Sequence, residues 1–206
     1  MDEQQHKNLE QAKWEENVRR TEDAAKRIFP HEKWVDAVSI KFKYQSEDLD
    51  LTIGIENIKV ARSRLTHRKN DEQILAKEIN QGKILAEKGA SVYLLPKLKS
   101  PDGKYIPGPD ALVNGVLFEF KTVTGSIDRV ESRFRESREQ GQNVFIRVLN
   151  PDVSKQNVIQ KMRNVINDPK YTGGFKGDLI FSVIHGGFEN IYYAKISDFK
   201  KSTTTP

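Results

Sequence analysis

The dipeptide Asn114-Gly115 constrains the fold of this chain more than any other local feature. It lies between residues 110–113 and residues 116–123, two stretches rich in apolar side chains. Asn-Gly between two such stretches is a strong short-range signal for a β-hairpin, because both residues tolerate the positive φ angles of a two-residue turn. The sequence therefore predicts a tight hairpin over residues 110–123.

Helical and strand-like patterns alternate around this hairpin. Asn70 and Asp71 are predicted to cap a helix over residues 72–88, which Gly89 ends. The other predicted elements are a strand at 91–95, a charged helix at 126–140, a strand at 143–149, a helix at 154–167 and strands at 178–184 and 190–196. The order from residue 71, α-β-β-β-α-β-α-β-β, is typical of an α+β domain with a mainly antiparallel sheet and packed helices.

The first seventy residues have a different pattern. Residues 2–28 predict a surface helix with a narrow apolar stripe, and Pro30 ends it. Residues 36–43 and 51–56 alternate as strands do, which predicts a second hairpin. We therefore expect a helix-and-hairpin segment of unknown role at 1–70, a main domain at 71–198 and a disordered tail at 199–206.

Composition excludes several classes of protein. The chain has 206 residues, of which 36% are hydrophobic and 31% charged, which indicates a real core with an appreciable solvated portion. It has no cysteine, so disulfides and thiolate metal sites are excluded. The apolar runs are much shorter than the roughly 20 residues that cross a bilayer. We expect no membrane partner, a cytoplasmic site of action, and export, if any, by another system.

The formal net charge of +5 favours polyanionic partners, although a slightly basic protein of any kind would have it. Residues 59–70 contain five basic residues and no acidic one, which is typical of a solvated linker or of an element that contacts phosphates. A loop rich in Lys, Pro and Gly is predicted at 96–109. Tyr105, Tyr171 and Tyr192 can stack on bases, but lone tyrosines are usually core or surface residues.

Glu119 and Lys121 are two apart on a predicted strand, so they point to the same face. Phe120 lies between them and supplies the opposite, buried face. Charged groups on an otherwise apolar strand are costly unless they pair or act in chemistry. The two-residue turn also places Asp110 opposite Glu119 in the hairpin. The sequence therefore predicts a cluster of three charged side chains.

Such a cluster can cleave a phosphodiester in two ways. Asp110 and Glu119 can bind a divalent cation such as Mg²⁺ while Lys121 steadies the attacking water or the phosphate. The pattern Pro109-Asp110…Glu119-Phe-Lys121 and the surrounding element order look like the PD-(D/E)xK nuclease signature. Alternatively, one carboxylate is the general base, basic side chains neutralise the phosphorane, and the 2′-hydroxyl of RNA is the nucleophile without any metal.

The simplest alternative is a cross-strand salt bridge on an exposed sheet face, which would contribute little to stability. A lysine on an exposed face also contributes little to packing. We therefore expect Lys121→Ala to abolish cleavage and to leave the fold intact.

The helix after the hairpin supplies further candidates. Arg129 and Arg133 are four residues apart and share a face that can bind phosphates, although ordinary pairing with the acidic residues of the same helix would also explain them. Gln140 either caps this helix or reaches the substrate. His185 is predicted at a loop tip, where it is either a proton shuttle or an exposed bystander.

From about residue 82 to residue 196 the chain resembles the tRNA-nuclease domain at the C-terminus of CdiA contact-dependent inhibition toxins. The similar segments are LAEKGASVYLLPKL, PDALVNGVLFEFKTVTGSI and EQGQNVFIRVLN, in this order. The most specific one is the hairpin with the pattern D-x-x-x-N-G-x-x-x-(D/E)-x-K-T. Related domains occur in mobile-element and phage proteins.

This resemblance implies an endoribonuclease toxin that acts on tRNA and is controlled by a cognate immunity protein. The family is placed with the barnase–EndoU–colicin–RelE-like ribonucleases, which need no metal cofactor and use the 2′-hydroxyl of the substrate. The catalytic residues that it implies are Asp110, Glu119, Lys121 and Thr122, with Gln140 as a further matching position.

Three functions are therefore considered. The favoured function is a metal-independent endoribonuclease toxin that cleaves tRNA. The main alternative is a metal-dependent PD-(D/E)xK-type nuclease, with Asp110 and Glu119 as Mg²⁺ ligands. The third is a non-catalytic nucleic-acid-binding protein of a mobile element. In the first two, we expect the substrate to be bound by Arg129, Arg133, Gln140 and His185.

Overall fold

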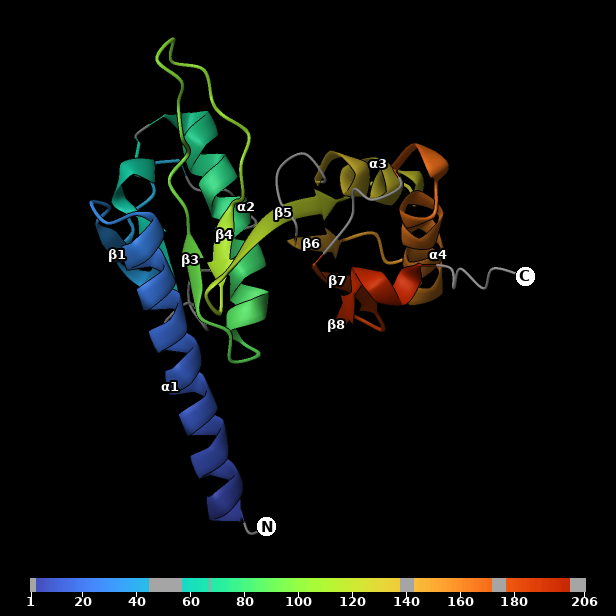
Figure 1. The fold of residues 1–206 in the computed structure, drawn as a ribbon, viewed down its shortest axis with the longest axis horizontal. Helices are drawn as coiled ribbons and strands as arrows, with labels where there is room; N and C mark the ends of the chain where they lie inside the picture. The colour runs from blue at the N-terminus through green and yellow to red at the C-terminus, as the bar shows by residue number, and fades with distance from the viewer. Residues whose placement is uncertain (1–2, 45–56, 67, 138–142, 172–176, 201–206) are drawn as a thin grey trace. The chain divides into compact units, whose positions relative to one another are not determined.

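The computed structural model describes residues 3–44, 57–66, 68–137, 143–171 and 177–200 (Figure 1). The chain forms two compact units. Unit 1 consists of Met1–Ile106 and Asp110–Leu117, and unit 2 consists of Pro107–Pro109 and Phe118–Pro206. Helices and strands occur in both units, which confirms the predicted α+β class.

Unit 1 contains four strands with a helix on each face. The helices are α1 (Glu3–Ile28) and α2 (Lys69–Ala86), and the strands are β1 (Trp34–Asp36), β2 (Ile58–Ala61), β3 (Val92–Leu94) and β4 (Ala111–Val113). The strand order is β1-β2-β3-β4, in which the middle pair is parallel and the outer pairs are antiparallel.

Side chains of β3 point alternately to the two faces of the sheet, and each face contacts a different helix of unit 1. Tyr93 packs with Leu112 of β4 and with Ala24 and Ala25 of α1. Val92 points to the other face, where α2 approaches so closely that a Cβ on Gly82 would lie 3.2 Å from a Val92 methyl group. Because successive side chains of a strand point to opposite faces, α1 and α2 cover opposite faces of the sheet.

Unit 2 contains the remaining strands, with two helices on one face. Its elements are most of β5 (Val116–Val123), then α3 (Asp128–Ser137), β6 (Asn143–Val148), α4 (Lys155–Ile166), β7 (Asp178–His185) and β8 (Phe188–Lys195). The strand order is β5-β6-β7-β8, with two parallel pairs followed by an antiparallel one. Parallel neighbours require crossover connections, which α3 and α4 supply.

The core of unit 2 lies between its sheet and these two helices. Val144, Ile146 and Val148 of β6 project into it, together with Phe134 of α3 and Met162 of α4. All five side chains are buried. The 3-10 turn η4 (Ile196–Phe199) also packs there, and its Phe199 is buried although the sequence analysis placed residue 199 in the tail. Residues 201–206 lie outside the described part of the chain.

The predicted order of elements after residue 71 is confirmed, whereas several details upstream are wrong. The helix expected at 72–88 begins at Lys69, and its N-cap Arg68 makes no side-chain capping bond. Asp71 does not cap it, because its carboxylate accepts a hydrogen bond from the Thr66 hydroxyl at 2.8 Å. Gly89 does end the helix, with a φ of 81°. The predicted domain boundary at residue 70 stays a prediction.

Two predictions within the first seventy residues are corrected. The strand expected at 36–43 ends at Asp36 and continues as the 3-10 turn η1 (Ala37–Ser39), where Val38 is exposed, so its alternation does not mark a buried face. Its expected partner at 51–56 lies outside the described residues. The basic run at 59–70 is not a solvated linker, because it enters β2, where Val60 and Ala61 are buried.

Candidate active site

The predicted turn is present at the tip of the hairpin that starts with β4. Asn114 and Gly115 have φ angles of 51° and 81°. The Asn114 side chain accepts a hydrogen bond from the Ser91 amide at 2.9 Å, which ties the turn to the start of β3. A Cβ on Gly115 would lie 2.9 Å from the carbonyl oxygen of Arg20, so glycine also permits the close approach of α1.

A group of four charged side chains, three of them buried, lies in unit 1, and we call it the α2–β4 cluster. Lys97 Nζ pairs with Asp110 Oδ1 and lies 3.4 Å from Glu78 Oε1. Arg64 Nη1 pairs with the other carboxylate oxygen of Glu78. Arg64, Glu78 and Asp110 are buried, whereas the Lys97 side chain is 33% exposed. Two carboxylates thus meet at one ammonium group that solvent can reach.

The electrostatics of this cluster keep Lys97 charged. Burial of the ammonium group lowers the pKa of Lys97, but the carboxylates of Glu78 and Asp110 outweigh this and raise the pKa above its usual value. Lys97 is therefore a protonated cation at neutral pH. It balances charge that would be costly to leave uncompensated in a buried site.

Glu119 and Lys121 of β5 form a second buried pair, in unit 2. Lys121 Nζ lies 2.6 Å from Glu119 Oε1, and the two side chains are 13% and 3% exposed, respectively. In the sheet Glu119 is in register with Val144 of β6 and Lys121 with Ile146, so both side chains point to the helix-covered face. The prediction that they share a face is confirmed. The expected exposed face is wrong, and so is the reason for expecting Lys121→Ala to leave the fold intact.

Thr122 points to the opposite face of β5 and is not brought together with Glu119 and Lys121. It is in register with Arg147 of β6. The Arg147 guanidinium donates hydrogen bonds to the Glu189 carboxylate at 2.8–3.1 Å, and the Ser182 hydroxyl donates to the same carboxylate at 2.5 Å. Thr122 therefore lies beside a separate polar network.

The residues expected to bind the substrate lie on different elements, Arg129 and Arg133 on α3 and His185 on β7. Arg133 pairs with Glu136 one turn along α3, at 2.7 Å, which is ordinary helix-surface pairing. Arg129 is exposed and has no ion pair within the described part of the chain. His185 is exposed at the end of β7, opposite Phe188 and beside a Gly-Gly turn, as predicted. Gln140 lies outside the described residues.

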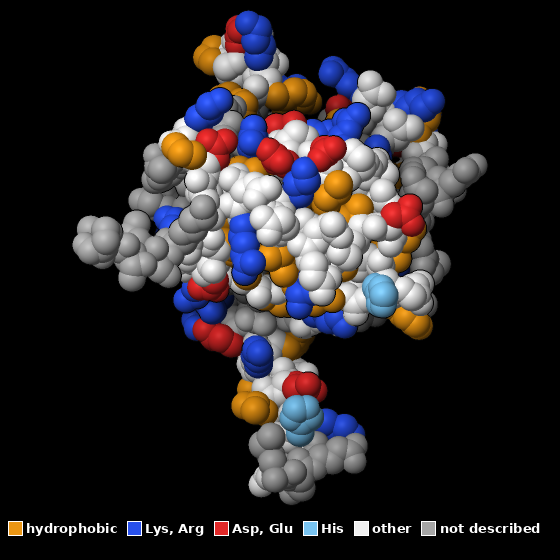
Figure 2. Space-filling view, turned by 90° about the vertical axis from the view of Figure 1, so that its right-hand side faces the viewer, with side chains coloured by type: hydrophobic (Ala, Val, Ile, Leu, Met, Phe, Trp, Pro, Cys, Tyr) orange, Lys and Arg blue, Asp and Glu red, His pale blue; other side chains and the backbone are white. Residues whose placement is uncertain are grey.

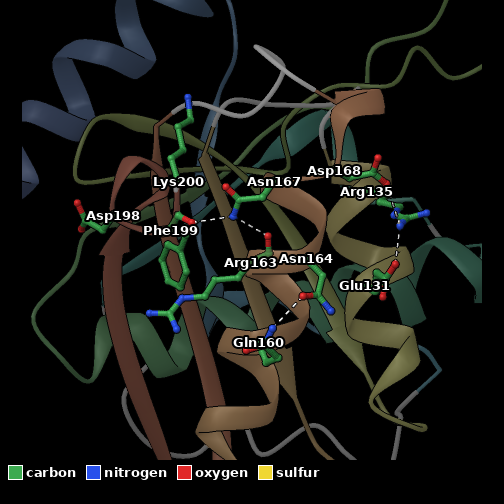
Figure 3. A pocket seen from close by; sticks show the side chains of 10 residues that line it. All are labelled: Glu131, Arg135, Gln160, Arg163, Asn164, Asn167, Asp168, Asp198, Phe199 and Lys200. Atoms are coloured by element: carbon green, nitrogen blue, oxygen red, sulfur yellow. Dashed lines mark hydrogen bonds and ion pairs between the residues drawn. The ribbon is translucent and has the colours of Figure 1, made fainter. Parts of the chain in front are cut away.

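An open pocket of about 740 Å³ lies between α3, α4 and η4 of unit 2 (Figure 3). Asn167 donates hydrogen bonds from its side chain to the carbonyl oxygens of Arg163 and Phe199, and the Arg163 guanidinium lies over the Phe199 ring. The charged residues that line it are Arg135, Arg163, Lys200, Glu131, Asp168 and Asp198. Basic and acidic groups are balanced, and no predicted site residue lines this pocket.

Surface charge alone does not locate a site. On the face drawn in Figure 2, Lys and Arg side chains lie among Asp and Glu side chains. Within the described residues, no group of three or more His, Cys, Asp or Glu side chains is placed to hold a metal ion, and no helix is long and apolar enough to cross a membrane. The two buried charge groups remain the most distinctive chemical features.

Sequence reasoning missed Glu78 and Lys97. A signal for Glu78 exists, because it lies on the same helical stripe as Leu75, Gly82 and Leu85, all of which are buried. A carboxylate on such a stripe requires a partner. The sequence around Lys97 gives no comparable signal for a buried partner. Lys97 follows β3 in a stretch whose sequence predicts only a loop.

A comparison with protein-family models matches a segment that contains the hairpin. Residues 107–182 match the model of the contact-dependent growth inhibition CdiA C-terminal domain. The matched residues include Asp110, Glu119 and Lys121 but not Glu78 or Lys97. No curated protein and no solved structure was found to match the chain. CdiA C-terminal domains are toxin domains, commonly nucleases, that work with a cognate immunity protein. Over residues 107–182, the chain is similar to the CdiA C-terminal domain family.

Proposed function

We propose that this protein is a nuclease toxin domain that cleaves RNA, with tRNA as the favoured substrate. The observation that carries the proposal is a pair of buried carboxylate–ammonium contacts, one preceding β4 and one on β5: Asp110 with Lys97 and Glu119 with Lys121. Buried charges of this kind are costly to maintain for stability alone. Asp110, Glu119 and Lys121 lie on the segment that matches a family of toxin domains.

Two carboxylates of the α2–β4 cluster fit the metal-dependent mechanism. Glu78 and Asp110 already direct oxygen atoms at one cation, the ammonium of Lys97. Mg²⁺ is commonly bound by one or two carboxylates, with water and substrate phosphates as the other ligands. Glu78 and Asp110 would hold the ion. The bound ion would supply Lewis-acid activation of the phosphodiester.

The arrangement of strands supports the same mechanism. The helix α2 is followed by β3, β4 and β5, then by α3 and β6. β3 and β4 are antiparallel, whereas β5 and β6 are parallel. This is the element order that resembles the PD-(D/E)xK nucleases. In this mechanism Lys97 balances charge at the carboxylates of Glu78 and Asp110.

The metal-independent ribonuclease remains a second candidate, and one observation favours it. A protonated lysine, Lys97, already occupies the position between Glu78 and Asp110. In this mechanism Glu119 takes the proton of the ribose 2′-hydroxyl, and Lys121 neutralises the charge that develops on the phosphorane.

The two mechanisms differ in a digest of total tRNA. Loss of cleavage in excess EDTA, restored by Mg²⁺, is the result expected for the metal-dependent enzyme. Cleavage that persists in EDTA and leaves 2′,3′-cyclic phosphate ends would establish the metal-independent one. Glu119→Gln, which removes the charge of the β5 carboxylate, should lose cleavage. Glu136→Gln on the exposed surface of α3 is its matched control and should cleave normally. Binding without cleavage under either condition would overturn the nuclease proposal.

We also infer that the toxin acts in the cytoplasm, where its proposed substrate lies, and that a cognate immunity protein blocks it. Expression of the chain alone should arrest growth, and co-expression of its immunity protein should restore it. Normal growth on expression of the chain alone would contradict this inference.

A further inference from the structure

Residues 97–106, which the sequence analysis describes as a loop, form a small ordered hairpin in unit 1, and we call it the arm. Its turn is Ser100-Pro101-Asp102-Gly103, in which the Gly103 amide donates to the Ser100 carbonyl at 2.8 Å. Gly103 has a φ of 82°, and the Ser100 amide donates to the Lys104 carbonyl at 2.9 Å. Proline and glycine at these positions favour such a turn.

The arm presents two different exposed faces. Lys99 and Tyr105 form a bridge pair opposite each other, and Lys99 Nζ lies 4.9 Å from the centre of the Tyr105 ring. Leu98 and Ile106 are neighbours on the other side, linked by a backbone hydrogen bond of 2.9 Å. The exposed fractions of Tyr105, Leu98 and Ile106 are 53%, 53% and 48%. Leu98, Tyr105 and Ile106 therefore expose apolar surface on one short hairpin.

The arm is connected directly to the α2–β4 cluster. It begins at Lys97, which pairs with Asp110 and approaches Glu78. Residues 97–106 contain three lysines, Lys97, Lys99 and Lys104, and one acidic residue, Asp102. The arm therefore joins net positive charge and an exposed aromatic ring to the carboxylates of the proposed site.

We propose that the arm binds an unpaired nucleotide of the RNA substrate, with the base stacked on Tyr105 and a phosphate beside Lys99. Lys99 covers one side of the Tyr105 ring, and a base would stack on the other side. Proteins recognise single-stranded RNA by stacking its bases on aromatic side chains, while lysines contact the backbone. The proposal rests on the proposed function, because it takes RNA as the substrate.

Binding can be measured without cleavage under either mechanism. The probe is a fluorescein-labelled 2′-O-methyl RNA of 12 unpaired nucleotides, titrated with the full chain in EDTA and followed by fluorescence anisotropy. Tyr105→Ala should raise the Kd by about 5- to 150-fold, since a stacked base contributes about 1–3 kcal/mol. Tyr105→Trp should retain binding. Lys99→Gln should weaken binding most at low salt and should reduce its salt dependence.

Tyr193, which is 62% exposed on β8, supplies the matched control, and Tyr193→Ala should leave the Kd unchanged. An unchanged Kd for Tyr105→Ala, or no binding of the probe by the wild-type chain, would overturn the role of the arm. Cleavage of tRNA by the wild-type chain tests the proposed function separately. If Tyr105→Ala impairs only inhibition by the immunity protein, the arm is a protein-binding surface and the proposal is wrong.

Discussion

At the scale of single residues, the account depends on carboxylates that are buried beside ammonium groups. Glu119 is almost wholly buried and its partner Lys121 nearly so, which the sequence could not reveal. Alternation along a strand predicts that two residues share a face, but it does not predict what covers that face. The covering helices α3 and α4 come from later in the chain.

Lys121→Ala should lower the free energy of unfolding by about 3–5 kcal/mol, because it leaves a buried carboxylate without its cation. Urea denaturation measures this change. Arg133→Ala, which removes an exposed partner of Glu136, is the control and should cost less than about 1 kcal/mol. A similarly small change for Lys121→Ala would show that Glu119 does not depend on this lysine.

The contribution of Lys97 to stability should depend on pH in the alkaline range. Its pKa is raised in the folded state, so its contribution is complete below the unfolded value, about 10.4, and is lost as the pH rises through the folded value. The difference in Tm between the wild type and Lys97→Met should therefore be constant from pH 7 to pH 9 and shrink above about pH 10.4.

Lys104→Met, at an exposed lysine of the arm, is the control, and its Tm difference should stay small throughout this range. A Tm difference for Lys97→Met that grows with pH would contradict the charge assignment in the α2–β4 cluster.

At the scale of elements, local patterns predicted much of the fold. Asn114-Gly115 located the hairpin, and the order of helical and strand-like patterns after residue 71 located α3 and α4. The parallel pairing of β5 with β6 was not predictable in this way, because it joins strands whose contact depends on the packing of an intervening helix. The strand predicted at 36–43 shows the same limit. Its apolar residues alternate as in a strand, but Val38 is exposed to solvent.

The candidate site was predictable to the same extent. Asp110, Glu119 and Lys121 were found because they lie on one hairpin. Glu78 joins Asp110 and Lys97 only when α2 packs against the sheet of unit 1, which brings together residues far apart in the chain.

Gly115→Ala should destabilise the hairpin more than Gly103→Ala does. Both glycines have φ angles near 80°, so alanine is strained at either position. Only at Gly115 would the new Cβ also meet backbone, at 2.9 Å from the Arg20 carbonyl oxygen, whereas open space surrounds Gly103. We expect Gly103→Ala to cost about 1 kcal/mol and Gly115→Ala more than that. Equal Tm values for the two variants would contradict the close approach of α1 to the turn.

At the scale of the whole molecule, the chain combines a CdiA C-terminal domain match with residues outside that match. Glu78, Lys97 and the arm all precede residue 107, where the match begins. The proposed chemistry therefore uses residues from both sides of this boundary. A net charge of +5 assists the binding of any polyanion, but it does not select the substrate.

The most direct test of the account is the rate of tRNA cleavage by Asp110→Asn in Mg²⁺, measured beside its Tm. Asp110 is the acidic residue at which the family match, the hairpin and the α2–β4 cluster coincide. We expect the rate to fall by at least about 100-fold while the variant remains folded. A folded Asp110→Asn variant that cleaves tRNA at the wild-type rate would contradict the proposed site.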